Sequence, residues 1–218
     1  MTLKARYVTP LPDGVDPVQA AAVPLVFLTA WGMLRTRAEL KEGESVLVLG
    51  AASGVGSAAI QIAKSLGCTV LTTAGTEEKR ALGLELGADH AINHSEENWP
   101  REVKELTEGR GVDVVFEHVG PATWPGSLRS LARCGRLVTC GGTTGPMVEV
   151  ALPHLFMKNQ SILGSTMGPR AAFGEIFAGV ASGVFRPVVE RVLPIEEIQD
   201  AHRSLEAREV IGKLVLTF

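Results

Sequence analysis

Residues 45–64 read SVLVLGAASGVGSAAIQIAK and carry, in order, the patterns of a buried strand, a turn of small residues and a helix. The run from Val46 to Leu49 is uninterrupted and apolar, which is typical of a strand covered on both faces in a parallel sheet. Gly50, Gly54 and Gly56 allow a tight turn whose backbone N–H groups stay open at the positive end of the following helix. Such a turn favours the binding of a phosphate group.

The rest of the chain alternates between strand and helix patterns. Asp16 and Pro17 predict a helix start, and the apolar segment 18–40 is expected to lie across a sheet. Further strands are predicted over 68–73, 90–93, 112–116, 136–140, 161–165, 188–193 and 213–217, and further helices over 76–87, 100–107, 123–133, 173–184 and 195–205. This alternation with short connections predicts one α/β domain: a doubly wound Rossmann sheet of parallel strands in the order 3-2-1-4-5-6.

Composition excludes several classes of protein. The 218 residues carry a net charge of −3, which gives no basic field for nucleic acid. Cys68, Cys134 and Cys140 lie too far apart in sequence to suggest a disulfide framework or a zinc knuckle. The N-terminus lacks the pattern of a signal peptide, and the apolar stretch 23–34 is too short to span a bilayer. We therefore expect a cytoplasmic protein that binds neither nucleic acid nor membrane.

Glycines gather where a ligand is expected in this fold. Ligands of doubly wound sheets lie beyond the carboxyl ends of the strands, where the strand order reverses. Gly120 follows the fourth predicted strand, and Gly141 and Gly142 follow the fifth. Together with the glycines of the first turn, they predict a cleft along this edge of the sheet.

The end of the second strand bears on which dinucleotide is bound. An NAD site usually places a carboxylate about 20 residues beyond the glycine turn, and this region holds Ala74 instead. Lys79 and Arg80 follow one helical turn later, which favours the 2′-phosphate of NADPH over NADH. Glu77 and Glu78 lie in the same helical turn and would repel a phosphate if they faced it, and all four charges are also compatible with a solvated helix start.

No side chain is assigned a catalytic role. Glu117 and His118 are adjacent on a strand and point to opposite faces, so we expect a loop or core role for both. Cys140 lies beside the glycines of the fifth strand and is interpreted as a buried thiol. His154 and His202 lack metal-ligand spacing to another histidine or cysteine and are interpreted as structural.

Five segments together resemble a known family: GAASGVGSAAIQIAK, TAGTEEK, GADHAINHSEE, GVDVVFEHVG and GKLVL. They are similar to the cofactor domain of medium-chain dehydrogenases/reductases, in the branch of quinone oxidoreductases and their alcohol-dehydrogenase-like relatives. The resemblance covers residues 7–218. It implies hydride transfer between NADP(H), with NAD(H) less favoured, and a small carbonyl, enone or quinone.

The resemblance also implies a set of cofactor-binding residues. The pyrophosphate is expected at Ala52, Ser53, Gly54, Val55 and Gly56. Lys79, close to Thr76, is expected at the 2′-phosphate, and His94 replaces an aromatic residue that packs beside the adenine ribose in the family. Nicotinamide contacts are expected at Gly141, Gly142, Thr143 and Thr29, and Gly120 completes the set.

The resemblance implies no metal and a second protomer. The position of the catalytic cysteine ligand in zinc alcohol dehydrogenases is Leu25 here, whose aliphatic side chain cannot ligate zinc. The family's N-terminal barrel-like catalytic domain is expected to be missing, which makes residues 1–15 a residual linker and residues 16–218 the dinucleotide-binding domain. The strand Ser161–Ser165 is expected to pair with its symmetry mate in a homodimer.

Two rival enzyme classes fit the sequence poorly. A short-chain dehydrogenase needs a tyrosine followed four residues later by a lysine, but Tyr7 is followed at that spacing by Leu11. A methyltransferase of similar sheet order needs an acidic residue where Ala74 stands. A nucleotide-binding module or sensor without catalysis stays open as the alternative function.

Overall fold

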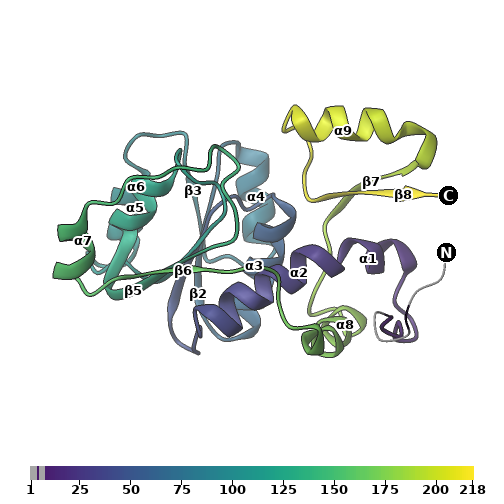
Figure 1. Ribbon diagram of the computed structural model, residues 1–218, viewed down its shortest axis with the longest axis horizontal. Coiled ribbons are helices and arrows are strands. Elements are labelled where there is room, and N and C mark those ends of the chain that lie inside the picture. Colours follow the sequence, from purple (N-terminus) through teal and green to yellow (C-terminus); the bar gives the residue numbers. More distant parts are fainter. Residues whose placement is uncertain (1–3, 5–7) are drawn as a thin grey trace.

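The computed structural model describes residue 4 and residues 8–218, so Tyr7 and part of the expected linker lie outside the described residues. Its centre is a six-stranded sheet in which every pair is parallel and the order is β3-β2-β1-β4-β5-β6, which confirms the predicted Rossmann topology. The strands are β1 (Ser45–Val48), β2 (Thr69–Ala74), β3 (His90–Asn93), β4 (Val112–Glu117), β5 (Leu131–Thr139) and β6 (Ser161–Gly164) (Figure 1).

Helices cover both faces of this sheet and create two cores. Val46 and Val48 of β1 belong to one core, and Leu47 and Leu49 belong to the other, as strand alternation requires. The first core includes α2 (Pro24–Trp31) and α3 (Gly54–Ser65), and the second includes α5 (Trp99–Leu106) and α6 (Trp124–Ser130). The remaining helices are α1 (Pro17–Ala22), α4 (Glu77–Glu85), α7 (Leu152–Met157), α8 (Phe173–Ala181) and α9 (Ile198–Glu206), with a π-helical turn at Gly32–Arg37 and short 3₁₀ turns at Arg170–Ala172 and Ile195–Glu197.

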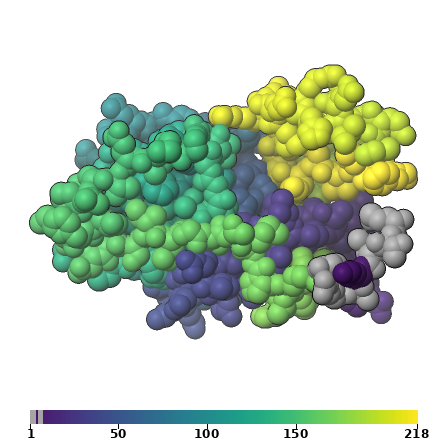
Figure 2. Space-filling model, viewed as in Figure 1, coloured from purple at the N-terminus to yellow at the C-terminus, as the bar shows by residue number. Residues whose placement is uncertain are grey.

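The C-terminal strands form a second, small sheet. β7 (Val189–Pro194) and β8 (Lys213–Thr217) pair in parallel, and α9 crosses between them (Figure 1). Figure 2 shows this C-terminal segment, in yellow, standing beside the teal half of the molecule with blue segments in the hollow between them. The Gly212 N–H donates to the Ala52 carbonyl over 2.8 Å, so the chain returns to the glycine turn just before β8 begins.

Proline and a left-handed residue account for two differences from the predicted boundaries. The apolar segment 18–40 is interrupted at Val23, which ends α1, because Pro24 starts a new helix. The helix predicted over 123–133 ends at Ser130, and β5 begins there instead of at Arg136. Cys134 has φ +59°, which no helix residue adopts, and the register between β4 and β5 shifts at this point.

The predicted helix faces near the C-terminus are only partly buried. Ile176, Phe177 and Val180 of α8 are buried, whereas Val184 lies beyond the helix and is exposed. On α9 only Ala201 is buried, and Ile198 and Leu205 are exposed. The short helix α7 was not predicted and buries none of its residues.

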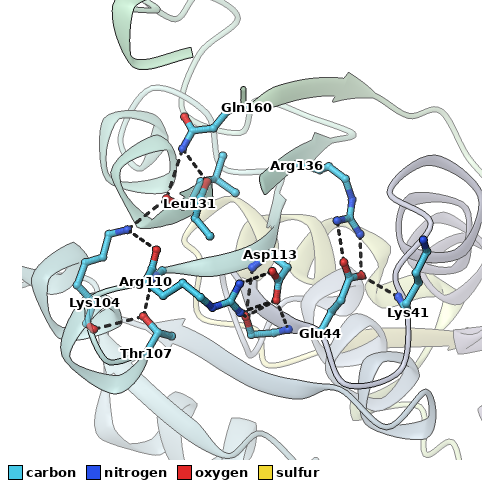
Figure 3. A network of polar contacts seen from close by, with 12 residues as sticks. Lys41, Glu44, Lys104, Thr107, Arg110, Asp113, Leu131, Arg136 and Gln160 are labelled. Atoms are coloured by element: carbon cyan, nitrogen blue, oxygen red, sulfur yellow. Dashed lines mark hydrogen bonds and ion pairs between the residues drawn. The ribbon is translucent and has the colours of Figure 1, made fainter. Parts of the chain in front are cut away.

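A polar network stabilises the end of the sheet opposite the glycine turns, where β1, β4 and β5 begin (Figure 3). Asp113 accepts hydrogen bonds from the Ser45 N–H at 2.8 Å and from Arg110 Nη1 at 2.6 Å. Arg136 donates to both carboxylate oxygens of Glu44, over 2.9 and 2.8 Å. These pairs stabilise the sheet far from the glycine turns, which leaves the carboxyl ends of the strands to the site.

Within the described part of the chain, no helix combines the length and apolarity needed to cross a membrane.

Candidate functional site

The glycine turn between β1 and α3 is built around the Ser53 hydroxyl. Ser53 caps the helix by accepting from the Gly56 N–H at 2.9 Å, and it donates to the Gly50 carbonyl at 2.9 Å. A Cβ on Gly56 would lie 2.1 Å from the Gly50 oxygen, so the turn closes this tightly only with glycine there. Among the described residues, the N–H groups of Gly54 and Val55 meet no acceptor. A helix N-terminus with open amides fits an anionic phosphate group.

A cavity of about 290 Å³ opens where β2 ends. It brings together five of the predicted site residues, and its full lining is Gly50, Ala52, Ser53, Ala74, Gly75, Thr76, Lys79, His94, Arg208 and Val210. Glu77 and Glu78 are exposed to solvent and take no part in this lining, and neither does Arg80. The cavity wall therefore carries cations and no carboxylate.

Arg208 is a lining residue that the sequence patterns did not reveal. Lys79 Nζ donates to the Arg208 carbonyl over 3.1 Å, which joins helix α4 to the segment between α9 and β8. Arg208 has φ +60°, a left-handed conformation that is uncommon for a residue with a side chain. Two cationic residues from distant parts of the chain thus share one small cavity.

His94 lies in the same cavity as a neutral ring. Its Nδ1 is 3.0 Å from the Thr73 hydroxyl, which is itself 3.4 Å from the Gly50 N–H. Burial, and then the charge of Lys79, lower the pKa of His94 below its usual value. The ring thus adds hydrogen-bonding capacity and apolar surface to the cavity, whose lining also includes the cationic residues Lys79 and Arg208.

A second cavity, of about 310 Å³, lies on the other side of the turn. Its lining joins the predicted Thr29 and Val55 to Leu25, Val26, Cys140, Thr166 and Met167. Met167 has φ +53°, and its sulfur is 3.7 Å from the Thr29 hydroxyl. Burial raises the pKa of the Cys140 thiol to about 11, so the thiol is protonated near neutral pH.

The loop that follows β4 and the loop that follows β5 pack against each other. A Cβ on Gly120, whose φ is +90°, would lie 3.1 Å from Gly142 Cα, so these loops are in close contact. Thr143 donates to the His118 carbonyl from its N–H at 3.3 Å and from its hydroxyl at 3.1 Å. Gly120, Gly141, Gly142 and Thr143 line neither cavity. Their predicted contact with a ligand stays a prediction.

Glu117 and His118 point in opposite directions, as strand alternation predicts. The buried Glu117 carboxylate accepts four hydrogen bonds, from the N–H groups of Val119 and Gly120 and from the hydroxyls of Thr123 and Ser127, at 2.6–3.1 Å. His118 turns the other way, and its Nε2 lies 2.8 Å from the Leu49 carbonyl. The two residues therefore cannot act as one acid–base pair.

A protein zinc site needs a cluster of ligating side chains. No three of the described His, Cys, Asp and Glu side chains gather closely enough to hold a metal ion. Beside Leu25 the second cavity offers one thiol, and the raised pKa of Cys140 disfavours the thiolate that zinc requires.

The strand order and the glycine turn at its reversal point define a Rossmann-type α/β domain. The sequence profile of the family described as "Zinc-binding dehydrogenase" matches residues 54–182. The chain belongs to this family, within the medium-chain dehydrogenase/reductase superfamily, which confirms the resemblance noted in the sequence.

Individual relatives agree with this assignment. The chain is 38% identical to a quinone oxidoreductase of Pseudomonas aeruginosa over 215 residues, covering 94% of this chain and 66% of the relative. The crystal structure of an NAD-dependent alcohol dehydrogenase superposes with a TM-score of 0.93 at 41% identity, covering 96% of this chain and 61% of that one. A mycobacterial protein complexed with NADPH superposes with a TM-score of 0.87 at 33% identity, covering 95% and 67%. The chain thus spans about two-thirds of the length of the relatives it matches.

Proposed function

We propose that this chain binds NADPH across the carboxyl edge of its sheet. The observation that carries the proposal is the cavity at the end of β2, where Lys79 and Arg208 supply positive charge and Ala74 stands in place of a carboxylate. A 2′-phosphate would gain charge-assisted hydrogen bonds there, whereas the ribose hydroxyls of NADH would meet no carboxylate. Lys79 uses one of its three donors on the Arg208 carbonyl and keeps the others for a ligand.

We assign the predicted residues to three parts of the cofactor. Thr76, Lys79 and His94 take the phosphorylated ribose. Ala52, Ser53, Gly54, Val55 and Gly56 form the turn for the pyrophosphate. Thr29 takes the nicotinamide end, together with Gly120, Gly141, Gly142 and Thr143. Support comes from the two cavities, which lie on either side of the open amides of Gly54 and Val55.

We further propose that the whole protein is a zinc-independent oxidoreductase whose substrate is a small carbonyl, enone or quinone. A bound nicotinamide supplies the hydride in such chemistry. The residues of this chain would hold the nicotinamide end and exclude water from it, and the apolar lining around Val26, Val55 and Met167 suits that role. None of the described side chains is assigned as acid or base.

We propose a homodimer formed through β6, in a reducing cytoplasmic setting. β6 pairs with β5 on one side only within the described sheet, and open edges tend to find a partner strand. Leu152, Phe156 and Met157 of the neighbouring helix α7 are about two-thirds exposed, which adds apolar surface to this edge. A monomeric mass at micromolar concentration in small-angle scattering would overturn the dimer.

The experiment for the cofactor is a titration of the chain with NADPH and NADH by calorimetry. We expect tighter binding of NADPH, and we expect Lys79→Ala to weaken NADPH by about ten- to a hundredfold while NADH changes little, because one charge-assisted hydrogen bond is lost. Lys158→Ala, a lysine that lines neither cavity, is the matched control. Equal affinity for both dinucleotides, or preference for NADH, would refute the proposal.

A turnover assay with small quinones and aldehydes separates the two functions that the sequence left open. Reduction of any of them by the NADPH-loaded chain would assign catalysis to the chain itself. Binding without turnover would support the nucleotide-binding module.

A further inference from the structure

His118 is a half-buried polar residue to which the proposed cofactor contacts assign no role. It is the first residue after β4 and lies where the strand order reverses. Its ring nitrogen Nε2 is 2.8 Å from the Leu49 carbonyl and 3.3 Å from the Ser53 hydroxyl. Its own carbonyl accepts both hydrogen bonds from Thr143. One residue therefore contacts the glycine turn through its ring and the loop after β5 through its backbone.

The hydrogen bonds determine which ring nitrogen carries the proton. A carbonyl can only accept, so the 2.8 Å contact to Leu49 requires a proton on Nε2. Burial lowers the pKa of His118, which keeps the ring neutral and leaves this single N–H donor. The single N–H of the ring therefore donates to the Leu49 carbonyl, directly before the glycine turn.

The single proton of the Ser53 hydroxyl is used within the glycine turn. The hydroxyl donates to the Gly50 carbonyl and accepts from the Gly56 N–H, and His118 Nε2, whose proton is directed to the Leu49 carbonyl, lies 3.3 Å from it. The hydroxyl has no remaining donor for a ligand, so its task is to hold the turn in shape. A Cβ on Gly50 would lie 3.2 Å from His118 Nε2, which shows how closely the ring is seated against the turn.

On the basis of the proposed NADPH binding, we propose that His118 is a positioning residue for the cofactor. Its ring holds the pyrophosphate turn, and its carbonyl holds the loop assigned to the nicotinamide. The residue thereby sets the two halves of the cleft relative to each other without itself lining either cavity. Filling space alone would not require an N–H donor at Nε2.

A pair of substitutions separates positioning from packing. His118→Gln keeps an amide N–H near the Nε2 position, whereas His118→Phe keeps the ring and removes the donor. We expect the phenylalanine variant to bind NADPH about three- to tenfold more weakly than the wild type, and the glutamine variant to recover most of the loss. Adenosine 2′-monophosphate, which reaches only the cavity at the end of β2, should bind both variants equally well. Ser53→Ala combined with His118→Phe should cost less than the two single losses together, because both side chains hold the same turn.

The possible failures are distinct. If the wild type does not prefer NADPH, the proposed function and this inference fall together. If the wild type binds NADPH and His118→Phe binds it equally well, or if glutamine restores nothing, only the role of His118 is overturned. If the phenylalanine variant does not fold, His118→Asn replaces it: its shorter amide falls short of the Leu49 carbonyl, and unchanged NADPH affinity in that variant would equally overturn the role.

Discussion

Substitution of Glu117, whose buried carboxylate binds the loop after β4, is the most exacting test of how the carboxyl edge of the sheet is stabilised. Among the described residues no cation contacts it, and its charge is met by two backbone N–H groups and two hydroxyls. These donors belong to the loop after β4 and to the first half of α6. Replacing Glu117 with alanine removes every acceptor at once, whereas glutamine keeps one carbonyl oxygen.

The expected magnitudes follow from the donors left behind. In the alanine variant Thr123 can turn its hydroxyl to the Gly120 carbonyl, already 3.3 Å away, but the N–H groups of Val119 and Gly120 lose their acceptor. An unsatisfied buried donor costs about 1–3 kcal/mol, so two of them cost about 2–6 kcal/mol of unfolding free energy. Glutamine can keep both amide contacts, and its NH₂ group displaces only the hydroxyl donors, for about 1–2 kcal/mol.

Urea unfolding followed by circular dichroism and tryptophan fluorescence measures both changes. Alanine should lower the unfolding free energy by a large share of the 5–15 kcal/mol typical of a domain, and glutamine by much less. Glu105→Ala, on the exposed face of α5, is the control and should change little. The reasoning is refuted if glutamine costs as much as alanine, or if alanine costs less than about 1 kcal/mol.

Two further predictions concern acid stability and thiol reactivity. The Arg110 hydrogen bond holds the pKa of Asp113 below its usual range, so its stabilisation is complete above the ordinary aspartate pKa of about 3.9 and is lost as the pH falls. Asp113→Asn should therefore flatten the loss of unfolding free energy between about pH 5 and pH 3, and parallel curves for the two proteins would contradict this. Burial raises the pKa of Cys140 to about 11, so iodoacetamide at about pH 8 should modify the exposed Cys134 first, as peptide mass spectrometry can measure. Equal rates at the two cysteines would contradict the protonated, buried thiol.

Local patterns were sufficient for most of the fold. The apolar run of β1 predicted a strand covered on both faces, and Val46 and Leu47 indeed enter different cores. Strands β3 and β8 have the predicted bounds, because short apolar runs between turn residues leave few alternatives. The sheet order followed from the alternation of strands and helices, which restricts how parallel strands can be connected.

The junction of α6 and β5 shows where such patterns fail. Leu128, Leu131 and Ala132 have a spacing that suits a helix, and the sequence alone does not indicate that the backbone turns after Ser130. The left-handed φ of Cys134 accompanies a hydrogen bond of 2.8 Å from its N–H to the Lys158 carbonyl. A contact between residues so far apart in the chain overrides local helix preference, so it is visible only in three dimensions.

The same distinction applies to the site, where Lys79 was predicted and Arg208 was missed. Lys79 has a local signal, because it follows the end of β2 at the spacing where the ribose is recognised. Arg208 reaches the cavity only because Gly212 returns the chain to the Ala52 carbonyl, with φ +77° and with 2.4 Å between an added Cβ and the Val188 oxygen. A side chain at Gly212 would push this segment away from the glycine turn and would take the arginine with it. The charge of the cavity therefore depends on a glycine that touches no ligand, and the sequence alone offers no reason to connect the two.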